Sequence, residues 1–446
     1  MAFHDGFLWG AATSSYQVEG GAESDGRKPS IWDITSQKKK TARYGETGNI
    51  STDHYHKFRE DVELFKKIGL KAYRFSISWS RVIPDGIGKV NEKGLKFYSD
   101  LVDELLNAGI EPLVTLFHWD LPYALYLKGG YGNPEFPQWF QQYTKVIVDA
   151  LSDRVKYWIT MNEPQCVFGC GYWMGEHAPF LKCDNHTIIV MIHNYLKAHG
   201  IAVKTIRKYA KINSKIGIAP MAPVTVPEDD SIRNISIARE KTFSMDGIFF
   251  SKSLYSDPMI LGKYPDECWQ VFGDEMINPS KEDMDLICQP LDFYGLNIYF
   301  SDENNENGGY PDGFYQGGPH TDTNWVINEK SIYWSAKFMY ERYKLPVLIT
   351  ENGMANADII SIDGYVHDPQ RIDFIHRYLN MLKNVIEEGV PVIGYIYWSA
   401  LDNYEWADGY DKRFGLIYVD YRTQKRIIKD SAFWLKEVIE SNGTNL

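Results

Sequence analysis

Two glutamates follow apolar runs of the chain, at positions where a pair of carboxyl groups could do acid–base chemistry. Glu163 lies in Ile-Thr-Met-Asn-Glu-Pro (159–164), and Glu351 lies in Leu-Ile-Thr-Glu-Asn-Gly (348–353). A single glutamate after a strand is commonly a helix cap or a solvated charge. Two of them across one cavity suit glycoside hydrolysis, which needs one protonated and one ionised carboxyl group.

Polar and aromatic side chains also stand at the ends of nearly all the strands that the sequence predicts. Besides the two glutamates, these residues are Gln17, Arg74, His118, Trp119, Asn162, Asn297, Tyr299, Asn352 and Trp398. A purely structural scaffold does not require polar groups at so many strand ends. We therefore interpret them as the lining of a site.

The aromatic content has two interpretations. The chain has 13 Trp, 30 Tyr and 22 Phe, which could serve a large core with half-buried tyrosines. Some tryptophans, however, have polar neighbours in sequence, and sugar rings pack their apolar C–H faces on indoles. The predicted sugar-binding lining consists of Trp119, Trp325, Trp398 and Trp406 together with Gln17, His118, Asn162 and Glu405.

Short strand-like stretches alternate with longer amphipathic segments from one end of the chain to the other. The predicted strands are 7–14, 72–78, 111–117, 156–160, 215–219, 292–299, 347–350 and 392–398. The predicted helices are 52–68, 92–108, 136–151, 187–210, 231–250, 331–343 and 369–388. This pattern predicts an α/β fold, a (β/α)8 TIM barrel with elaborated βα loops and the site at the strand ends.

An open doubly wound sheet is the alternative fold, but no Gly-x-Gly-x-x-Gly turn follows a strand and no phosphate loop is present. No composition shift divides the chain, so we expect one catalytic domain over 1–446. The polar range 301–324 is either a long loop over the site or a disordered surface insertion.

Composition excludes several classes of protein. The net charge of −12 over 446 residues has the wrong sign for a nucleic-acid binder. The first basic residue is Arg27, after Asp5 and Glu19, and no apolar run reaches the length of a membrane span. We therefore expect a cytoplasmic protein with neither a membrane nor a nucleic-acid partner.

The cysteines suggest neither a disulfide framework nor a metal site. The chain has five, an odd number, and Cys166, Cys170, His177 and Cys183 contain no Cys-x-x-Cys pair. Ordinary loop or core cysteines are the better interpretation. No metal or other cofactor is expected.

Six motifs together carry a resemblance over essentially the whole chain. They are 7–20 (FLWGAATSSYQVEG), 73–81 (YRFSISWSR), 115–122 (TLFHWDLP), 160–164 (TMNEP), 349–353 (ITENG) and 398–410 (WSALDNYEWADGY). In these motifs the chain resembles the family 1 glycoside hydrolases, the β-glucosidase family of (β/α)8 barrels. The resemblance implies a retaining β-glucosidase that acts on terminal β-D-glucosyl residues of short oligosaccharides and of aryl or alkyl glucosides.

The same resemblance implies a role for each site residue. Glu163 would be the general acid/base and Glu351 the nucleophile, supported by Arg74, Tyr299 and Asn297. The first sugar would contact Gln17, His118, Trp119, Asn162, Glu405 and Trp406 above a Trp398 platform, and Trp325 would face the leaving group. The sequence is also compatible with a homo-oligomer.

Two alternatives stay open beside this interpretation. A 6-phospho-β-glycosidase of the same family would need small or basic groups where this chain has Glu405. A non-catalytic carbohydrate-binding barrel would need one carboxylate to be absent. The chain also departs from the family pattern at Gln165, Phe180, Glu329, Ser331 and Ile332. Of these, Gln165 is expected to make the leaving-group side more polar.

Overall fold

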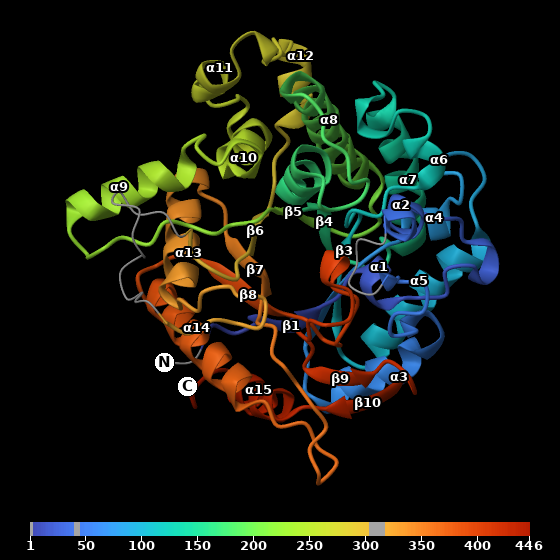
Figure 1. The fold of residues 1–446 in the computed structure, drawn as a ribbon, viewed down its shortest axis with the longest axis vertical. Coiled ribbons are helices and arrows are strands. Elements are labelled where there is room, and N and C mark those ends of the chain that lie inside the picture. Colours follow the sequence, from blue (N-terminus) through green and yellow to red (C-terminus); the bar gives the residue numbers. More distant parts are fainter. Residues whose placement is uncertain (1–2, 40–44, 303–316) are drawn as a thin grey trace.

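Eight parallel strands close into a barrel in the computed structural model, which describes residues 3–39, 45–302 and 317–446 (Figure 1). In chain order they are β1 (Leu8–Ala12), β2 (Ala72–Ser76), β3 (Glu111–Thr115), β4 (Tyr157–Asn162), β5 (Lys215–Ala219), β6 (Phe293–Asn297), β7 (Val347–Asn352) and β8 (Val392–Trp398). Each strand pairs with the next, and β8 pairs with β1. The predicted (β/α)8 fold is confirmed.

Helices surround the strands on the outside of the barrel (Figure 1). The longer ones are α3 (His54–Lys67), α5 (Glu92–Asn107), α7 (Phe136–Leu151), α8 (Asn185–Tyr209), α9 (Ile232–Phe243), α10 (Lys252–Leu261), α13 (Lys330–Tyr343), α14 (Pro369–Glu387) and α15 (Asp430–Glu440). Shorter elements are α1 (Ser15–Val18), α2 (Ile31–Lys39), α4 (Trp79–Val82), α6 (Tyr123–Tyr126), α11 (Glu267–Phe272), α12 (Lys281–Ile287) and the hairpin β9 (Ile417–Asp420) and β10 (Lys425–Ile428).

The predicted helix 231–250 is too long. Ser231 caps α9 by accepting a hydrogen bond from the backbone of Asn234, but the helix ends at Phe243. The remainder is a turn and a 3-10 turn that starts at Ile248, whose φ of 48° cannot continue an α-helix. The predicted loop 301–324 lies largely outside the described residues, so its interpretation is not resolved.

The barrel interior is filled by side chains from alternating positions of the strands. Leu113, Ile159, Phe293, Leu348 and Ile396 are buried there. A Cβ on Gly217 would lie 2.3 Å from the Phe293 ring, so only glycine leaves room for that ring. The interior is therefore a packed core that gives the strand ends a rigid base.

The carboxyl ends of three strands are irregular. The pairing register shifts between Ile159 and Asn162, between Leu296 and Asn297, and between Ile349 and Asn352. Such irregularities change the direction of side chains at barrel rims. The sequence prediction ended β4 and β7 too early, because both strands continue through these shifts to Asn162 and Asn352.

The two ends of the described chain lie beside each other (Figure 1). The backbone N–H of Phe3 donates to the carbonyl of Asn442 at 3.0 Å, and Trp9 Nε1 donates to Asn442 Oδ1 at 2.9 Å. His4 Nε2 is 3.0 Å from the carbonyl oxygen of Val392, where β8 begins. This junction is thus at the amino-terminal end of the strands. None of the helices in the described ranges has the length and apolar character of a membrane crossing.

Candidate active site

Glu351 lies near the end of β7 and is held on both of its carboxylate oxygens. A guanidinium nitrogen of Arg74 donates to Oε1 at 2.5 Å, and the Tyr299 hydroxyl donates to Oε2 at 2.6 Å. Arg74, buried in β2, is fixed in turn by donation to Thr115 Oγ1 and to the Thr350 carbonyl, both at 3.0 Å. Two donors, one of them cationic, therefore favour an ionised Glu351.

Glu163 follows β4 directly and has different partners. Asn297 Nδ2 donates to its Oε1 at 2.9 Å, and the Cys166 thiol lies 3.5 Å from its Oε2. Its φ of 38° is in the left-handed region, which is rare for a residue with a Cβ. The backbone N–H of Glu163 donates to the Ala219 carbonyl at 2.8 Å and holds this conformation. Strain of this kind gathers at functional sites.

One hydrogen-bond network joins the two carboxyl groups. Asn297 Nδ2 donates also to Asn162 Oδ1 at 3.0 Å, and a second guanidinium nitrogen of Arg74 donates to the same oxygen at 2.5 Å. The amide nitrogen of Asn162 donates to His118 Nε2 at 3.2 Å. The side chains of Asn162, Asn297 and Arg74 are buried, so the network sits in a low-dielectric interior.

The charges divide unequally between the two glutamates. Burial, reinforced by the negative charge of Glu351, raises the pKa of Glu163 to about 8. Burial also raises the pKa of Glu351, but Arg74 and the Tyr299 hydroxyl oppose that rise. At neutral pH the pair therefore carries its one negative charge on Glu351 and its one proton on Glu163.

A second polar group of the site involves Gln17 and Glu405. Gln17 is fully buried in α1, and its amide nitrogen donates to Glu405 Oε2 and to Asn403 Oδ1, both at 3.1 Å. Ser14 Oγ donates to Gln17 Oε1 at 2.7 Å and fixes the amide orientation. Burial, and then the charge of Asp408, raise the pKa of Glu405 well above its usual value.

The predicted tryptophans lie around these polar groups. The ring centroid of Trp406 is 4.5 Å from that of Trp119, and the His118 ring stacks 5.9 Å from both Trp398 and Trp406. Trp325 is half-buried, with its centroid 5.2 Å from that of Tyr299. The structure thus brings the predicted site residues into one connected group at the carboxyl ends of the strands. The exception is Asn352, whose side chain bonds to the Ile298 carbonyl and the Tyr395 hydroxyl instead.

Burial and the charge of Arg74 also set the protonation state of His118. Together they hold its pKa well below the usual histidine range, so the imidazole is neutral at neutral pH. A neutral ring that accepts from Asn162 on Nε2 carries its proton on Nδ1. His118 can therefore offer an N–H donor to a ligand without adding a charge.

Sequence reasoning missed several supporting residues. Thr350 Oγ1 donates to Asn297 Oδ1 at 2.7 Å and thereby orients the amide that holds Glu163. Thr115 accepts from Arg74, and Asn403 accepts from Gln17. For Thr115 and Thr350, the sequence did contain a signal: each is a hydroxyl side chain next to apolar residues of a strand.

The expectation for Gln165 is wrong. This side chain is fully buried, where its amide nitrogen donates to the Met221 carbonyl at 3.2 Å and its oxygen accepts from the Met221 N–H at 3.3 Å. Gln165 therefore holds the segment after β5 instead of presenting a polar group to a ligand. Cys166, which lies beside Glu163, is the neighbour that contacts the acid.

The cysteines of the chain are all free thiols. Within the described ranges, no set of three His, Cys, Asp or Glu side chains is arranged to hold a metal ion. Cys166 lies 3.3 Å from the Met221 sulfur, and a hydrogen bond with Cys170, reinforced by burial, raises the pKa of its thiol well above the usual value. Its thiol is therefore protonated and a poor nucleophile.

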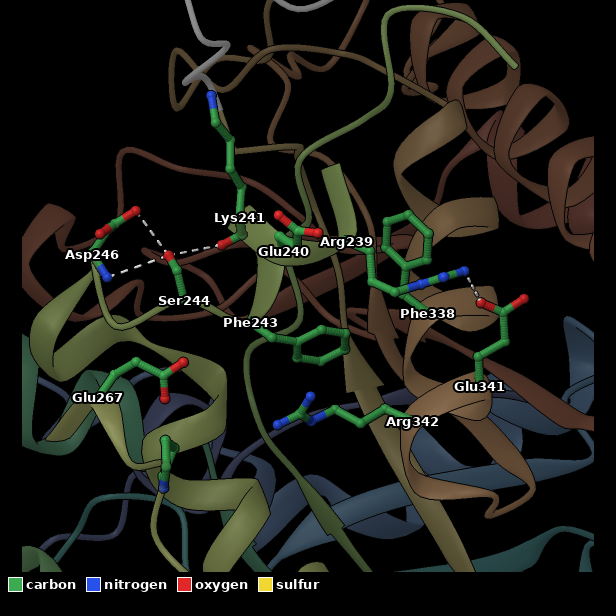
Figure 2. A pocket seen from close by; sticks show the side chains of 11 residues that line it. Arg239, Glu240, Lys241, Phe243, Ser244, Asp246, Glu267, Phe338, Glu341 and Arg342 are labelled. Carbon is green, nitrogen blue, oxygen red and sulfur yellow. Dashed lines mark hydrogen bonds and ion pairs between the residues drawn. The ribbon is translucent and has the colours of Figure 1, made fainter. Parts of the chain in front are cut away.

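A separate cavity of about 940 Å³ lies outside the barrel, between α9 and α13 (Figure 2). Arg239 pairs there with Glu341, and Arg342 pairs with Asp257 at 2.5 Å. Because no strand-end residue lines this cavity, the candidate active site is at the barrel rim and not here.

Comparison with known proteins agrees with this geometry. The model of glycosyl hydrolase family 1 matches residues 1–444. Beta-glucosidase A of Thermotoga maritima is 43% identical over 99% of this chain and 98% of its own length. A 1,4-beta-D-glucan glucohydrolase of Thermotoga neapolitana is 43% identical over 99% of both chains. The solved Thermotoga maritima beta-glucosidase in complex with glucoimidazole superposes with a TM-score of 0.91 at 42% identity, over 99% of both chains. The chain therefore belongs to glycosyl hydrolase family 1.

Proposed function

We propose that this enzyme is a retaining β-glucosidase that releases terminal β-D-glucosyl residues from short oligosaccharides and from aryl or alkyl glucosides. The observation that carries the proposal is the unequal environment of two buried carboxyl groups in one hydrogen-bond network. A retaining glycosidase needs one ionised and one protonated carboxyl group near the scissile bond. The relatives named beta-glucosidase support the substrate class.

In the first step Glu351 is the nucleophile. Its carboxylate attacks the anomeric carbon while Glu163 gives its proton to the glycosidic oxygen. The bond between carbon and that oxygen breaks, the alcohol leaves, and a glycosyl ester with Glu351 forms. Arg74 and Tyr299 hold Glu351 in place for this attack.

In the second step Glu163 is the base. Esterification removes the charge of Glu351, and that charge is one of the two causes that raise the pKa of Glu163. Glu163, now ionised, takes a proton from water while the water oxygen attacks the anomeric carbon. The ester bond breaks, which restores the Glu351 carboxylate and the protonated Glu163 and releases glucose with retained configuration.

The sugar hydroxyls are assigned to the polar groups around the nucleophile. Gln17, His118, Asn162 and Glu405 offer neighbouring donors and acceptors, and Trp398 provides the platform. Trp119 and Trp406 complete the lining. Glu405 offers no cationic partner to a phosphate on the sugar, which disfavours a 6-phospho-β-glycosidase.

The leaving group is assigned to the region near Trp325 and Met221. A cavity of about 460 Å³ is lined there by Met221, Phe250, Lys252, Phe300 and others. Met221 contacts Cys166, which in turn contacts Glu163, so the cavity is close to the acid. Its mixed apolar and polar lining suits an aryl group or a second sugar.

The test is an assay of p-nitrophenyl β-D-glucoside and of its 6-phosphate. Wild type should hydrolyse the first and not the second, and Glu351→Ala should lose the activity. Equal turnover by the variant, or turnover of the phosphorylated substrate alone, would refute the proposal.

A cytoplasmic location, a single catalytic domain over 1–446 and a homo-oligomer stay predictions. The free thiols support a reducing compartment. Fractionation of cells, limited proteolysis and sedimentation would test the three in turn.

A further inference from the structure

A buried cluster of charged side chains lies next to the segment that carries Glu405 and Trp406. Its carboxylates are Asp358, Asp368 and Asp402, and its cations are Arg371, Arg413 and Lys429. All of these side chains except that of Arg413 are fully inaccessible to solvent. The cluster is balanced, with three positive and three negative groups, which is what burial of charge requires.

Lys429 joins two rim segments, which Arg371 also links by donating to Asp358 Oδ2 and to the Arg413 carbonyl. Its ammonium donates to Asp402 Oδ1 at 2.7 Å and to Asp358 Oδ2 at 2.5 Å. Asp358 belongs to the segment after β7, the strand of Glu351, and Asp402 belongs to the segment after β8. Lys429 precedes α15, so a residue distant in sequence from both segments holds them together.

Asp402 in turn fixes both ends of the loop 403–414. Asp402 immediately precedes the loop, and its Oδ1 accepts from the N–H of Gly415, which immediately follows it, at 2.9 Å. Its Oδ2 accepts from Arg413 at 2.7 Å. A Cβ on Gly415 would lie 2.1 Å from the Asp402 nitrogen, so the two ends of the loop are in direct contact. Glu405 and Trp406 are inside this closed loop.

We propose that Lys429 is a positioning residue for sugar binding, and this inference rests on the proposed function. By holding Asp402 against Asp358, Lys429 sets the position of Glu405 and Trp406 relative to the nucleophile Glu351. Well-packed apolar side chains could stabilise this region as well as a buried ion cluster does. A cluster of directed charges adds a fixed geometry, which the site needs for its hydroxyl contacts.

The test is a double-mutant cycle on hydrolysis of p-nitrophenyl β-D-glucoside. The first change is Lys429→Gln with Asp358→Asn, which removes the link but keeps the remaining charges balanced. The second is Glu405→Gln. In the wild-type background, the Lys429/Asp358 change should lower kcat/KM about tenfold to a hundredfold, mainly through KM. In the Glu405→Gln background, the same change should cost several-fold less than in the wild type, because the contribution of Glu405 is already lost and only that of Trp406 remains.

The same double-mutant cycle can be measured without turnover, from the affinity of each protein for deoxynojirimycin by calorimetry. Equal losses in both backgrounds, by either measurement, would overturn the inference and leave Lys429 a purely structural residue. If the charge-balanced variant does not fold, Lys429→Arg replaces it in the cycle, with the same two outcomes. This variant keeps the charge but changes the geometry of the donors.

Arg342→Gln is the matched control. It removes a cation paired with a buried aspartate, Asp257. Arg342 lines the cavity on the outer face of the barrel (Figure 2). The substitution should lower the melting temperature without coupling to Glu405→Gln. Failure of the proposed function would look different, because the wild type itself would then neither hydrolyse the glucoside nor bind the inhibitor.

Discussion

Arg74 donates to Glu351 at 2.5 Å, whereas the amide of Asn297 holds Glu163. One carboxyl group thus faces a buried cation and the other a neutral donor, although both lie in the same network. This difference in partners separates the nucleophile from the acid.

Replacement of the acid should separate good from poor leaving groups. Glu163→Ala should lower kcat/KM about 10²–10⁴-fold on alkyl glucosides, because their alkoxide must be protonated as it leaves. On 2,4-dinitrophenyl β-D-glucoside the loss should be much smaller, and azide should restore turnover. The measurement is the release of each aglycone with and without azide, with product configuration by NMR.

Retention requires that the azide product be the β-glycosyl azide. An α product would contradict the double displacement. The exposed Glu282→Ala on α12 is the control, and it should leave both substrates unaffected.

The pH dependence of kcat/KM should be bell-shaped. Activity falls as pH rises through about 8, where Glu163 loses its proton, and it falls on the acid side as Glu351 becomes protonated. In Glu351→Gln the charge that raises the pKa of Glu163 is absent, so this pKa should drop below about 8. Carbon-13 NMR of labelled glutamate carboxyl groups would measure it. An unchanged value would mean that burial alone sets the pKa.

Tyr299→Phe should lower kcat/KM about tenfold to a hundredfold, which is the worth of one hydrogen bond to a charged group. The Tyr299 hydroxyl lowers the pKa of Glu351, so its loss should also shift the acid limb of the pH profile to higher pH. Tyr333→Phe removes a hydroxyl that donates to Glu388 on the surface and is the matched control. An unshifted acid limb would argue against this role of Tyr299.

Gly353→Ala should damage both stability and activity. Its Cβ would lie 1.9 Å from the Trp398 carbonyl oxygen, so either the β7 segment or Trp398 must move. We expect a loss of about 1–3 kcal/mol in the free energy of unfolding, measured with urea, and a raised KM. Gly132→Ala, whose nearest contact would be an ordinary 3.7 Å to Met191, should be nearly neutral. A wild-type KM in Gly353→Ala would show that Trp398 tolerates the displacement.

The strand order and the place of the site could be predicted because barrel strands alternate with amphipathic helices and carry polar residues at their carboxyl ends. The region from α10 to α12 could not be predicted. These helices are short, Pro258 lies inside α10, and Gly262 ends it at a φ of 72°, so no long periodic pattern forms. The hairpin of β9 and β10 was missed because each of its strands has only four residues.

Within the site, residue types were predictable but directions were not. Gln165 follows the strained turn at Glu163, and which way each side chain points there depends on a φ that the sequence does not reveal. Likewise Thr350 and Asn403 act through partners distant in sequence. Contacts of this kind exist only once the barrel has closed.

The junction of Phe3 with Asn442 has a practical consequence. Both residues lie at the base of the barrel, so the rim that carries Glu163 and Glu351 faces the other way. An enzyme tethered to a solid support near either residue would present its open rim to the surrounding substrate solution.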